Sequence, residues 1–232
     1  MLILGIESAS LTASVALLQD GKQLAEYTID YKKTHSQTLL PMIDEICGMT
    51  GTIPAQIDAI AISAGPGSFT GLRIGSATAK GLGLALKKPL ISVPTVGAMA
   101  YQCYGSRDLI CPIMDARRSQ VYTGLYEFAE DGTFVTIMDQ TPMAIEELLE
   151  KVNEMGRTVL FLGDGVPPYA ERIRELATVE VQFAPSFMAR QRAGAVAALG
   201  QVYYEAGRYE SAADHRPEYL RQSGAERMKD RQ

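Results

Sequence analysis

The apolar and polar positions at the start of the chain follow a strand-like pattern that then changes period. Short apolar runs occupy residues 2–7, 13–18 and 24–29. Asp20-Gly21, between the last two runs, favours a hairpin turn because glycine tolerates positive φ. From Thr34 the apolar residues recur at spacings of three and four, which is typical of one helix face. This part predicts an antiparallel three-stranded meander followed by a helix.

The rest of the chain continues in a repeating order. After that helix the pattern predicts a strand at 57–62, a helix at 70–86, a strand at 89–93 and a helix at 94–104. The same order then recurs, with strands at 109–114, 120–128 and 134–138, a helix at 145–152, a strand at 159–162, a helix at 168–176, a strand at 179–183 and a helix at 188–204.

This order predicts an α/β protein made of two tandem βββαβαβα units. Each unit is expected to hold a mixed sheet with helices on both faces. We place the first unit at residues 1–105 and the second at 106–232, and we expect the terminal helix to pack back on the first unit.

Charge and composition exclude several classes of function. The net charge is −5 and the pI is near 5.2, whereas a stand-alone tRNA or DNA binder is typically basic. Two histidines and three unpatterned cysteines make a zinc site improbable and favour a reducing cytoplasm. Because no apolar run approaches the roughly 20 residues of a membrane span, we expect no membrane association.

The most specific segment is the glycine-rich stretch 63–75, which lies between a predicted strand and a predicted helix. Backbone N–H groups at a helix N-terminus are suited to anions. However, the stretch lacks the Gly-Lys pair of a P-loop, and Thr70 occupies the third glycine position of a dinucleotide fingerprint. Neither nucleotide motif is therefore present in full.

Small residues form a ridge on the following helix. Gly71, Gly75, Ala79 and Gly83 are four apart and therefore share one face. Each glycine inside a helix lowers helix stability by roughly 0.8–1.0 kcal/mol relative to alanine. Several glycines on one face therefore indicate that another helix or backbone segment approaches this face closely. Two explanations are open: packing within the chain, on the sheet or on the helix at 34–49, or a contact between subunits.

Together these segments resemble the TsaB family, also called YeaZ. The matching segments are 3–18, 35–41, 65–75, 79–81, 115–118, 121–122 and 217–221, with GPGSFTG and DARR as the most specific motifs. The resemblance implies an actin/sugar-kinase/Hsp70-like (RNase H-like) fold, in agreement with the repeated order above. It implies a role in the bacterial synthesis of threonylcarbamoyladenosine in tRNA, and a cytoplasmic location.

The resemblance also implies that the chain is the non-catalytic paralogue in that system. The catalytic paralogue, TsaD, binds its metal with two histidines four residues apart. Thr95 and Met99 occupy the matching positions here, and neither is a suitable ligand for iron or zinc. We therefore expect no metal site and no catalytic residues, and the older glycopeptidase interpretation is disfavoured.

The resulting hypothesis is a scaffold that pairs through the helices at 34–49 and 70–86. Its partners would be a second copy when alone, the TsaD-like paralogue, and a TsaE-like ATPase that binds the assembled pair, with tRNA contacted only indirectly. No cofactor is expected in this chain, although ATP or ADP is a candidate at the assembled complex. The expected interface residues are His35, Leu39, Met42, Ile43, Ile46, Phe69, Thr70, Gly71, Arg73, Ile74, Gly75 and Ala79.

A second hypothesis is an ATP-dependent kinase or ATPase of the same fold. Glu7 and Asp115 end the first strand of each unit, and the resemblance implies that such acids help to place a Mg-nucleotide. Against this, the hairpin at 8–14 offers hydroxyls that cap a turn rather than the glycines of a phosphate loop. The one candidate adenosine loop, 162–165, is a weak match.

Three further polar features have interpretations of their own. With Arg117 and Arg118, Asp115 would form either a salt-bridged turn or a basic tip for RNA or a partner. His35 is interpreted as a helix-entry or interface residue, and His215, in a polar tail, is expected to be solvated.

Overall fold

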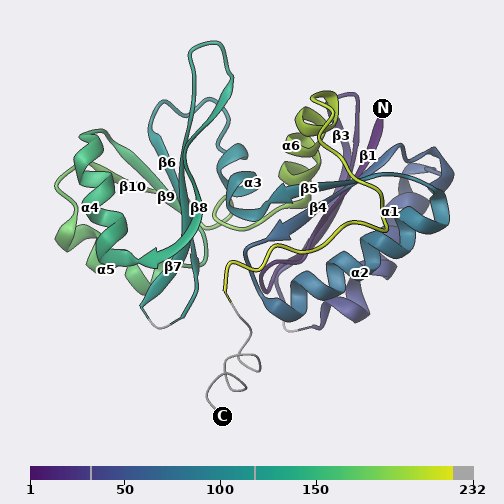
Figure 1. Cartoon of the computed structure of the whole chain (residues 1–232), viewed down its shortest axis with the longest axis horizontal. Coiled ribbons are helices and arrows are strands. Elements are labelled where there is room, and N and C mark those ends of the chain that lie inside the picture. The colour runs from purple at the N-terminus through teal and green to yellow at the C-terminus, as the bar shows by residue number, and fades with distance from the viewer. Residues whose placement is uncertain (32, 118, 222–232) are drawn as a thin grey trace.

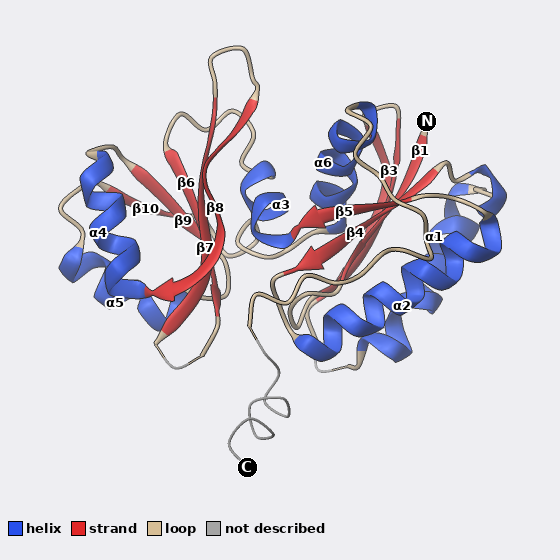
Figure 2. Ribbon diagram, in the orientation of Figure 1, coloured by secondary structure: helices blue, strands red, loops and turns tan. Residues whose placement is uncertain are grey.

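The computed structural model describes residues 1–31, 33–117 and 119–221. Figure 1 shows two α/β halves side by side, each built on a five-stranded sheet. In Figure 2 the two sheets lie between helices, and the helix α3 lies between the halves. None of the helices in the described ranges combines the length and the apolarity needed to cross a bilayer.

The first sheet has the strand order β3-β2-β1-β4-β5. Its strands are β1 (Leu2–Glu7), β2 (Ala13–Gln19), β3 (Lys22–Ile29), β4 (Ala59–Gly65) and β5 (Leu90–Pro94). The strands β1, β2 and β3 pair antiparallel, whereas β4 and β5 run parallel to β1. One face carries α1 (His35–Thr50) and α2 (Phe69–Leu86), which are joined through the short 3-10 helix η1 (Pro54–Gln56) and β4.

The second sheet repeats this arrangement strand for strand, in the order β10-β9-β6-β7-β8. Its strands are β6 (Leu109–Asp115), β7 (Gln120–Phe128), β8 (Phe134–Ala144), β9 (Val159–Leu162) and β10 (Val181–Phe183), with α4 (Ile145–Met155) and α5 (Val166–Leu176) on the outer side in Figure 1. The pairing directions are those of the first sheet. The predicted tandem of βββαβαβα units is confirmed.

The last helix of each repeat lies between the two sheets. The helix α6 (Ala193–Glu205) contacts the first sheet, while α3 (Thr95–Tyr101) contacts β6, β7 and β8 of the second sheet as well as β4 and β5. A Cβ on Gly200 of α6 would lie 2.6 Å from the Cβ of Ala61, so this helix needs glycine there to approach the sheet.

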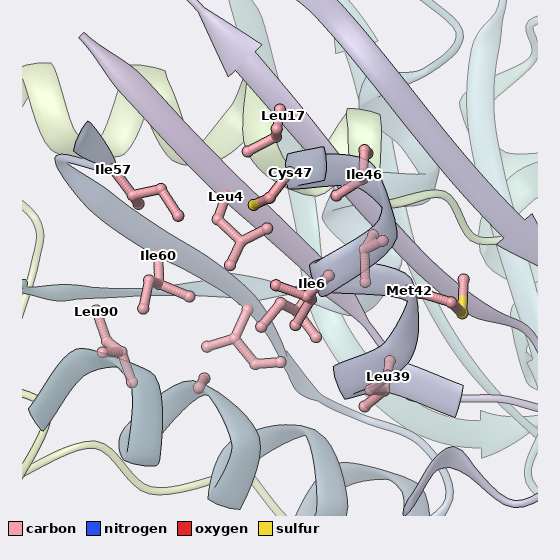
Figure 3. Close-up of a cluster of buried hydrophobic side chains, with 14 of the residues drawn as sticks. Leu4, Ile6, Leu17, Leu39, Met42, Ile46, Cys47, Ile57, Ile60 and Leu90 are labelled. Carbon is pink, nitrogen blue, oxygen red and sulfur yellow. The ribbon is translucent and has the colours of Figure 1, made fainter. Parts of the chain in front are cut away.

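The core of the first half lies between its sheet and α1. Figure 3 shows Leu39, Met42 and Ile46 of α1 in one cluster with Leu4 and Ile6 of β1. The apolar stripe predicted from Thr34 onward is thus the inner face of this helix. Packing of this stripe against the sheet is what holds α1 in place, since burying each large aliphatic side chain contributes about 1.5–3 kcal/mol.

Most element bounds agree with the sequence prediction to within three residues, and two differ by more. The helix α6 begins at Ala193 and not at residue 188, because side-chain contacts hold the preceding segment as a loop. Gln102 Nε2 donates to the Met188 carbonyl oxygen at 2.8 Å, and Arg190 pairs with Asp30 at 3.1 Å. The strand β8 continues to Ala144 rather than ending at 138. Its Pro142 is tolerated because β8 is an edge strand.

Candidate functional site

A polar cleft of about 550 Å³ lies between the two halves. Its walls come from the hairpin loop after β1, the N-terminus of α2, the turn after β6 and residues 218–221. The carboxyl ends of β1 and β6 meet at this place because the two halves are repeats with the same topology. In open α/β sheets, ligand sites form in the crevice at the carboxyl ends of strands.

Glu7, at the end of β1, is buried with 1% of its surface exposed and is not itself a lining residue of the cleft. Its Oε1 accepts a hydrogen bond from the Ala9 N–H at 2.6 Å, and its Oε2 has no partner among the described residues. Burial raises the pKa of this carboxyl to about 7, and the nearby charge of Asp164 acts in the same direction. The hydrogen bond from Ala9 and the polar groups of Ser63 and Ser8 nearby lower the pKa without cancelling the effect of burial. The Glu7 carboxyl therefore changes its protonation state near neutral pH.

Asp115 and Asp164 bring two more carboxyls to the cleft from the second half. Asp115 is exposed, and its Oδ1 accepts a hydrogen bond from the Arg117 N–H at 2.8 Å. Burial raises the pKa of Asp164, although the charge of Arg190 opposes this. Asp164 belongs to the weak candidate adenosine loop 162–165, but no role was predicted for its side chain. The expected role of Arg118 lies outside the described residues.

These carboxyls do not assemble into a metal site. Across the ranges 1–31, 33–117 and 119–221, no group of three or more His, Cys, Asp or Glu side chains is placed to hold a metal ion.

The polar groups of the hairpin after β1 bond within the protein. Ser8 Oγ donates to the Gly71 carbonyl oxygen at 3.0 Å, and Ser10 Oγ donates to Gln191 Oε1 at 2.9 Å. The Thr12 N–H donates to Ser10 Oγ at 3.1 Å. A phosphate loop needs N–H groups directed at the ligand. This hairpin is instead a capped turn, as its serine and threonine content predicts.

His35 joins the start of α1 to this hairpin. Its Nε2 lies 2.8 Å from the Ser10 carbonyl oxygen, and its ring packs at the place where a Cβ on Gly71 would lie. With 8% of its surface exposed, His35 faces inward. This geometry supports the helix-entry interpretation.

Eight of the twelve expected interface residues are buried within the chain, so their side chains do not form an exposed face here, and their place at a subunit interface stays a prediction. The buried residues are His35, Leu39, Met42, Ile43, Ile46, Gly71, Gly75 and Ala79. Phe69 and Ile74 are half-buried, and Thr70 and Arg73 are exposed. The physical reason is that the apolar stripe of α1 and the small ridge of α2 both cover their own sheet and hairpin.

The small ridge is explained by contacts within the chain. A Cβ on Gly71 would overlap the Ser8 carbonyl oxygen, and one on Gly75 would overlap the Ser8 hydroxyl. A Cβ on Gly83 would lie 2.8 Å from the Cβ of Ala212. Of the two explanations left open by the sequence, the structure therefore favours packing within the chain.

A different set of apolar residues lies on the surface of α1, of α2 and of the turn between α1 and η1. Leu40, Met49 and Ile53 are 55%, 73% and 63% exposed. With the half-buried Leu82 they line a groove of about 570 Å³, and we name these four residues the outer apolar face. The sequence analysis missed this face because Leu40 and Met49 lie beside the helical stripe, where pattern alone does not distinguish an exposed residue from a core residue.

Thr95 and Met99, at the positions matched to metal ligands of the paralogue, are both buried in α3. Met99 packs in the cluster that joins α3 to the second sheet, and its Cε would lie 2.9 Å from a Cβ on Gly163. These two side chains therefore fill the interior rather than face the cleft.

The expectation that His215 is solvated is wrong. Only 1% of His215 is exposed, and its Nδ1 lies 2.9 Å from both Ser92 Oγ and Glu210 Oε1. The cause is that the polar tail folds back over β5, where Glu210 pairs with Leu90.

Comparisons with known proteins agree with this architecture. The family model described as TsaD, tRNA N6-adenosine threonylcarbamoyltransferase, matches residues 23–229. The chain is 32% identical over 229 residues to the tRNA threonylcarbamoyladenosine biosynthesis protein TsaB of Bacillus subtilis, covering 97% of this chain and 96% of the relative.

Solved structures extend the comparison to the fold. YeaZ from Pseudomonas aeruginosa superposes with a TM-score of 0.82 and 26% identity, covering 94% of this chain and 99% of that chain. A ROK hexokinase from Thermus thermophilus shares the fold, with a TM-score of 0.50 and 9% identity, covering 89% of this chain and 100% of that chain. The predicted actin/sugar-kinase/Hsp70-like fold is thereby confirmed, and the chain belongs to the TsaB (YeaZ) family of tRNA threonylcarbamoyladenosine biosynthesis proteins.

Proposed function

We propose that this protein acts in the synthesis of threonylcarbamoyladenosine in tRNA as a non-catalytic scaffold subunit, and that it binds its partners through the outer apolar face. The observation that carries the proposal is the groove lined by Leu40, Met49, Ile53 and Leu82. Exposed apolar clusters on soluble proteins mark interaction sites, and the exposed Asp44 and Glu45, which also line the groove, suit the polar rim of an interface.

The partner that fits best is the TsaD-like paralogue, with a second copy of this chain taking its place when the protein is alone. The family model for TsaD covers most of this chain, which supports a paralogue with helices that correspond to α1 and α2. A TsaE-like ATPase would join the assembled pair, with ATP or ADP bound there. The net charge of −5 supports contact with tRNA through the other subunits and not through this chain. The complex would act in the cytoplasm.

Two observations support a scaffold rather than a catalyst. The positions matched to the metal ligands of TsaD hold Thr95 and Met99, which lie in the interior. The hairpin after β1 uses its polar groups for internal hydrogen bonds. Activation would then come from holding the paralogue in its active conformation.

The test is the double variant Met49→Asp/Ile53→Asp, which places charge in the groove without touching the core. Size-exclusion chromatography with light scattering, with and without the paralogue, should show loss of the homodimer and of the mixed complex. Transfer of the threonylcarbamoyl group to tRNA in the reconstituted system should fall in parallel.

The matched control is Phe187→Asp, because Phe187 is 74% exposed on the loop before α6 and is not a groove residue. If the groove variant keeps both complexes, or if the control disrupts them equally, the outer apolar face is not the interface.

The alternative function, an ATP-dependent kinase or ATPase, has the cleft and its carboxyls in its favour. Calorimetric titration of the isolated chain with Mg-ATP separates the two. Tight binding with turnover that is lost in Glu7→Gln would replace the scaffold proposal, whereas the scaffold proposal expects no turnover by the isolated chain.

A further inference from the structure

The chain after α6 returns across the molecule as an extended segment, residues 208–221, which we name the C-terminal strap. Figure 1 shows it in yellow, running across the first half over α2 and down towards the space between the halves. It carries no regular helix or strand. Its course is therefore set by side-chain and backbone contacts with the elements that it crosses.

The strap is first anchored on the first half. Glu210 pairs with Leu90 through two backbone hydrogen bonds of 2.9 Å at the open edge of β5. Ala212 is buried against Gly83, and Lys80 Nζ donates to the carbonyl oxygens of Ala213 and His215 at 2.9 Å. This part of the strap is therefore fixed to the first half of the molecule alone.

The strap then reaches the cleft and forms part of its wall. The Glu218 N–H donates to the Ala64 carbonyl oxygen at 2.7 Å, at the end of β4. The Tyr219 ring lies 4.6 Å from the Phe69 ring, centroid to centroid, at the start of α2. Glu218, Tyr219 and the two residues that follow line the cleft directly.

Two ties then join this segment to the second half. Gln140 of β8 donates through Nε2 to the Gly65 carbonyl oxygen at 3.0 Å and to Glu218 Oε2 at 2.7 Å. Arg221 Nη1 donates to the Ala116 carbonyl oxygen, just after β6, at 2.6 Å. Both ties cross between the halves at the cleft itself.

We propose that the C-terminal strap is a latch that holds the two halves at one angle and thereby sets the width of the cleft. The covalent chain passes between the halves only through segments 102–108 and 184–192 within the described residues. Such connections act as hinges as far as contacts between the halves allow. The buried packing of α3 against both sheets already joins the halves away from the cleft. The Gln140 and Arg221 ties add the restraint at the cleft itself, and their loss opens the cleft there. This proposal does not depend on the scaffold function.

The latch is tested by distances between spin labels on opposite halves of the intact chain. One pair is placed at Lys22→Cys and Glu147→Cys and a second at Gln37→Cys and Glu171→Cys, all at exposed positions. The native cysteines are buried. Labelled protein is diluted into unlabelled protein so that only distances within one chain are counted.

The latch variant is Gln140→Ala/Arg221→Ala. We expect a narrow distance distribution in the parent protein, and a broader one displaced by several ångströms in the latch variant for at least one label pair. Arg221→Lys keeps a donor for the Ala116 carbonyl oxygen and should keep the narrow distribution.

The matched control is Gln201→Ala/Arg157→Ala, which removes side-chain bonds that lie within one half each, to Gly21 and Glu127. Circular dichroism and thermal unfolding confirm that both double variants are folded. Unchanged distributions in the folded latch variant, or an equal change in the control, would overturn the proposal.

Discussion

Ser8 and Gly75 are in direct contact where the hairpin after β1 meets α2. A Cβ on Gly75 would overlap the Ser8 hydroxyl oxygen and would lie 3.2 Å from Ile62 Cδ1. The same hydroxyl donates to the Gly71 carbonyl oxygen. The hairpin after β1 therefore packs on a helix that carries no side chain at the point of contact.

This contact predicts opposite effects for two glycines of one helix. Gly75→Ala should lower the free energy of unfolding by about 1–3 kcal/mol, because a buried methyl group would displace Ser8. Gly81→Ala should raise it by about 0.5–1 kcal/mol, because Gly81 is exposed with nothing within 4 Å and alanine favours the helix. Urea unfolding at equal protein concentration measures both. Equal effects at the two positions would contradict the close packing.

The consecutive leucines of α1 should also differ. Leu39 is 1% exposed and Leu40 is 55% exposed. Leu39→Ala should lower the free energy of unfolding by about 2–5 kcal/mol, whereas Leu40→Ala should change it by less than about 0.5 kcal/mol. The unfolding curves are compared at low protein concentration, so that association does not contribute. A larger loss for Leu40→Ala would restore the original assignment of Leu39 to a contact face.

Glu7 makes stability depend on pH in a defined direction. Its folded-state pKa of about 7 lies above its ordinary value of 4.5, so the folded protein keeps a proton that the unfolded chain releases between these values. The free energy of unfolding therefore decreases as pH rises through this window, by roughly 3 kcal/mol at about 1.4 kcal/mol per pKa unit.

Glu7→Gln should remove this dependence, because the amide stays neutral and its oxygen still accepts from the Ala9 N–H. The difference in Tm between variant and parent should be small at pH 4.5 and should favour the variant at pH 8. Parallel pH profiles for the two proteins would show that Glu7 is not the titrating group.

The three cysteines should be unreactive in the native protein. Cys47, Cys103 and Cys111 are all buried, and burial raises the pKa of Cys103 to about 11 and that of Cys111 to about 12. Because the thiolate is the reactive form, an aromatic disulfide reagent at pH 8 should modify these thiols only slowly, and all three rapidly in denaturant. Rapid modification of a native thiol would show that the fold opens locally around it.

Periodicity predicted most of the fold. The alternating runs and the three-and-four spacing placed the strands and helices near their observed positions, and the repeat of that order predicted the duplicated sheet. The start of α6 was not predictable in this way. Residues 188–192 are compatible with a helix, but contacts of Met188 and Arg190 with distant residues hold them as a loop.

The residues of the site were predictable from the sequence only where the two repeated units place equivalent residues at their strand ends. Glu7 and Asp115 occupy equivalent strand ends; Asp115 lines the cleft, and Glu7 is buried beside it and bonded to the lining residue Ala9. Whether an apolar residue of a helix faces the core or the solvent depends on what covers that helix, and the sequence pattern does not show this. For that reason Leu39, which is buried, was assigned to an interface, and the exposed Leu40 was not considered. His215 was misassigned because its polar neighbours gave no sign that the tail folds back over β5.

The position of α6 on the first sheet has a consequence for the order in which the protein is completed during synthesis. The ribosome delivers all five strands of the first sheet before residue 95, yet the helix that covers one face of that sheet ends at Glu205. Once the sheet is complete, the apolar side chains of Ile3, Ala61 and Val93 on that face therefore wait for residues 95–205, close to half of the chain, to follow. The first half is complete in space only when the second half has already been made, so the nascent chain exposes an aggregation-prone surface through close to half of its translation.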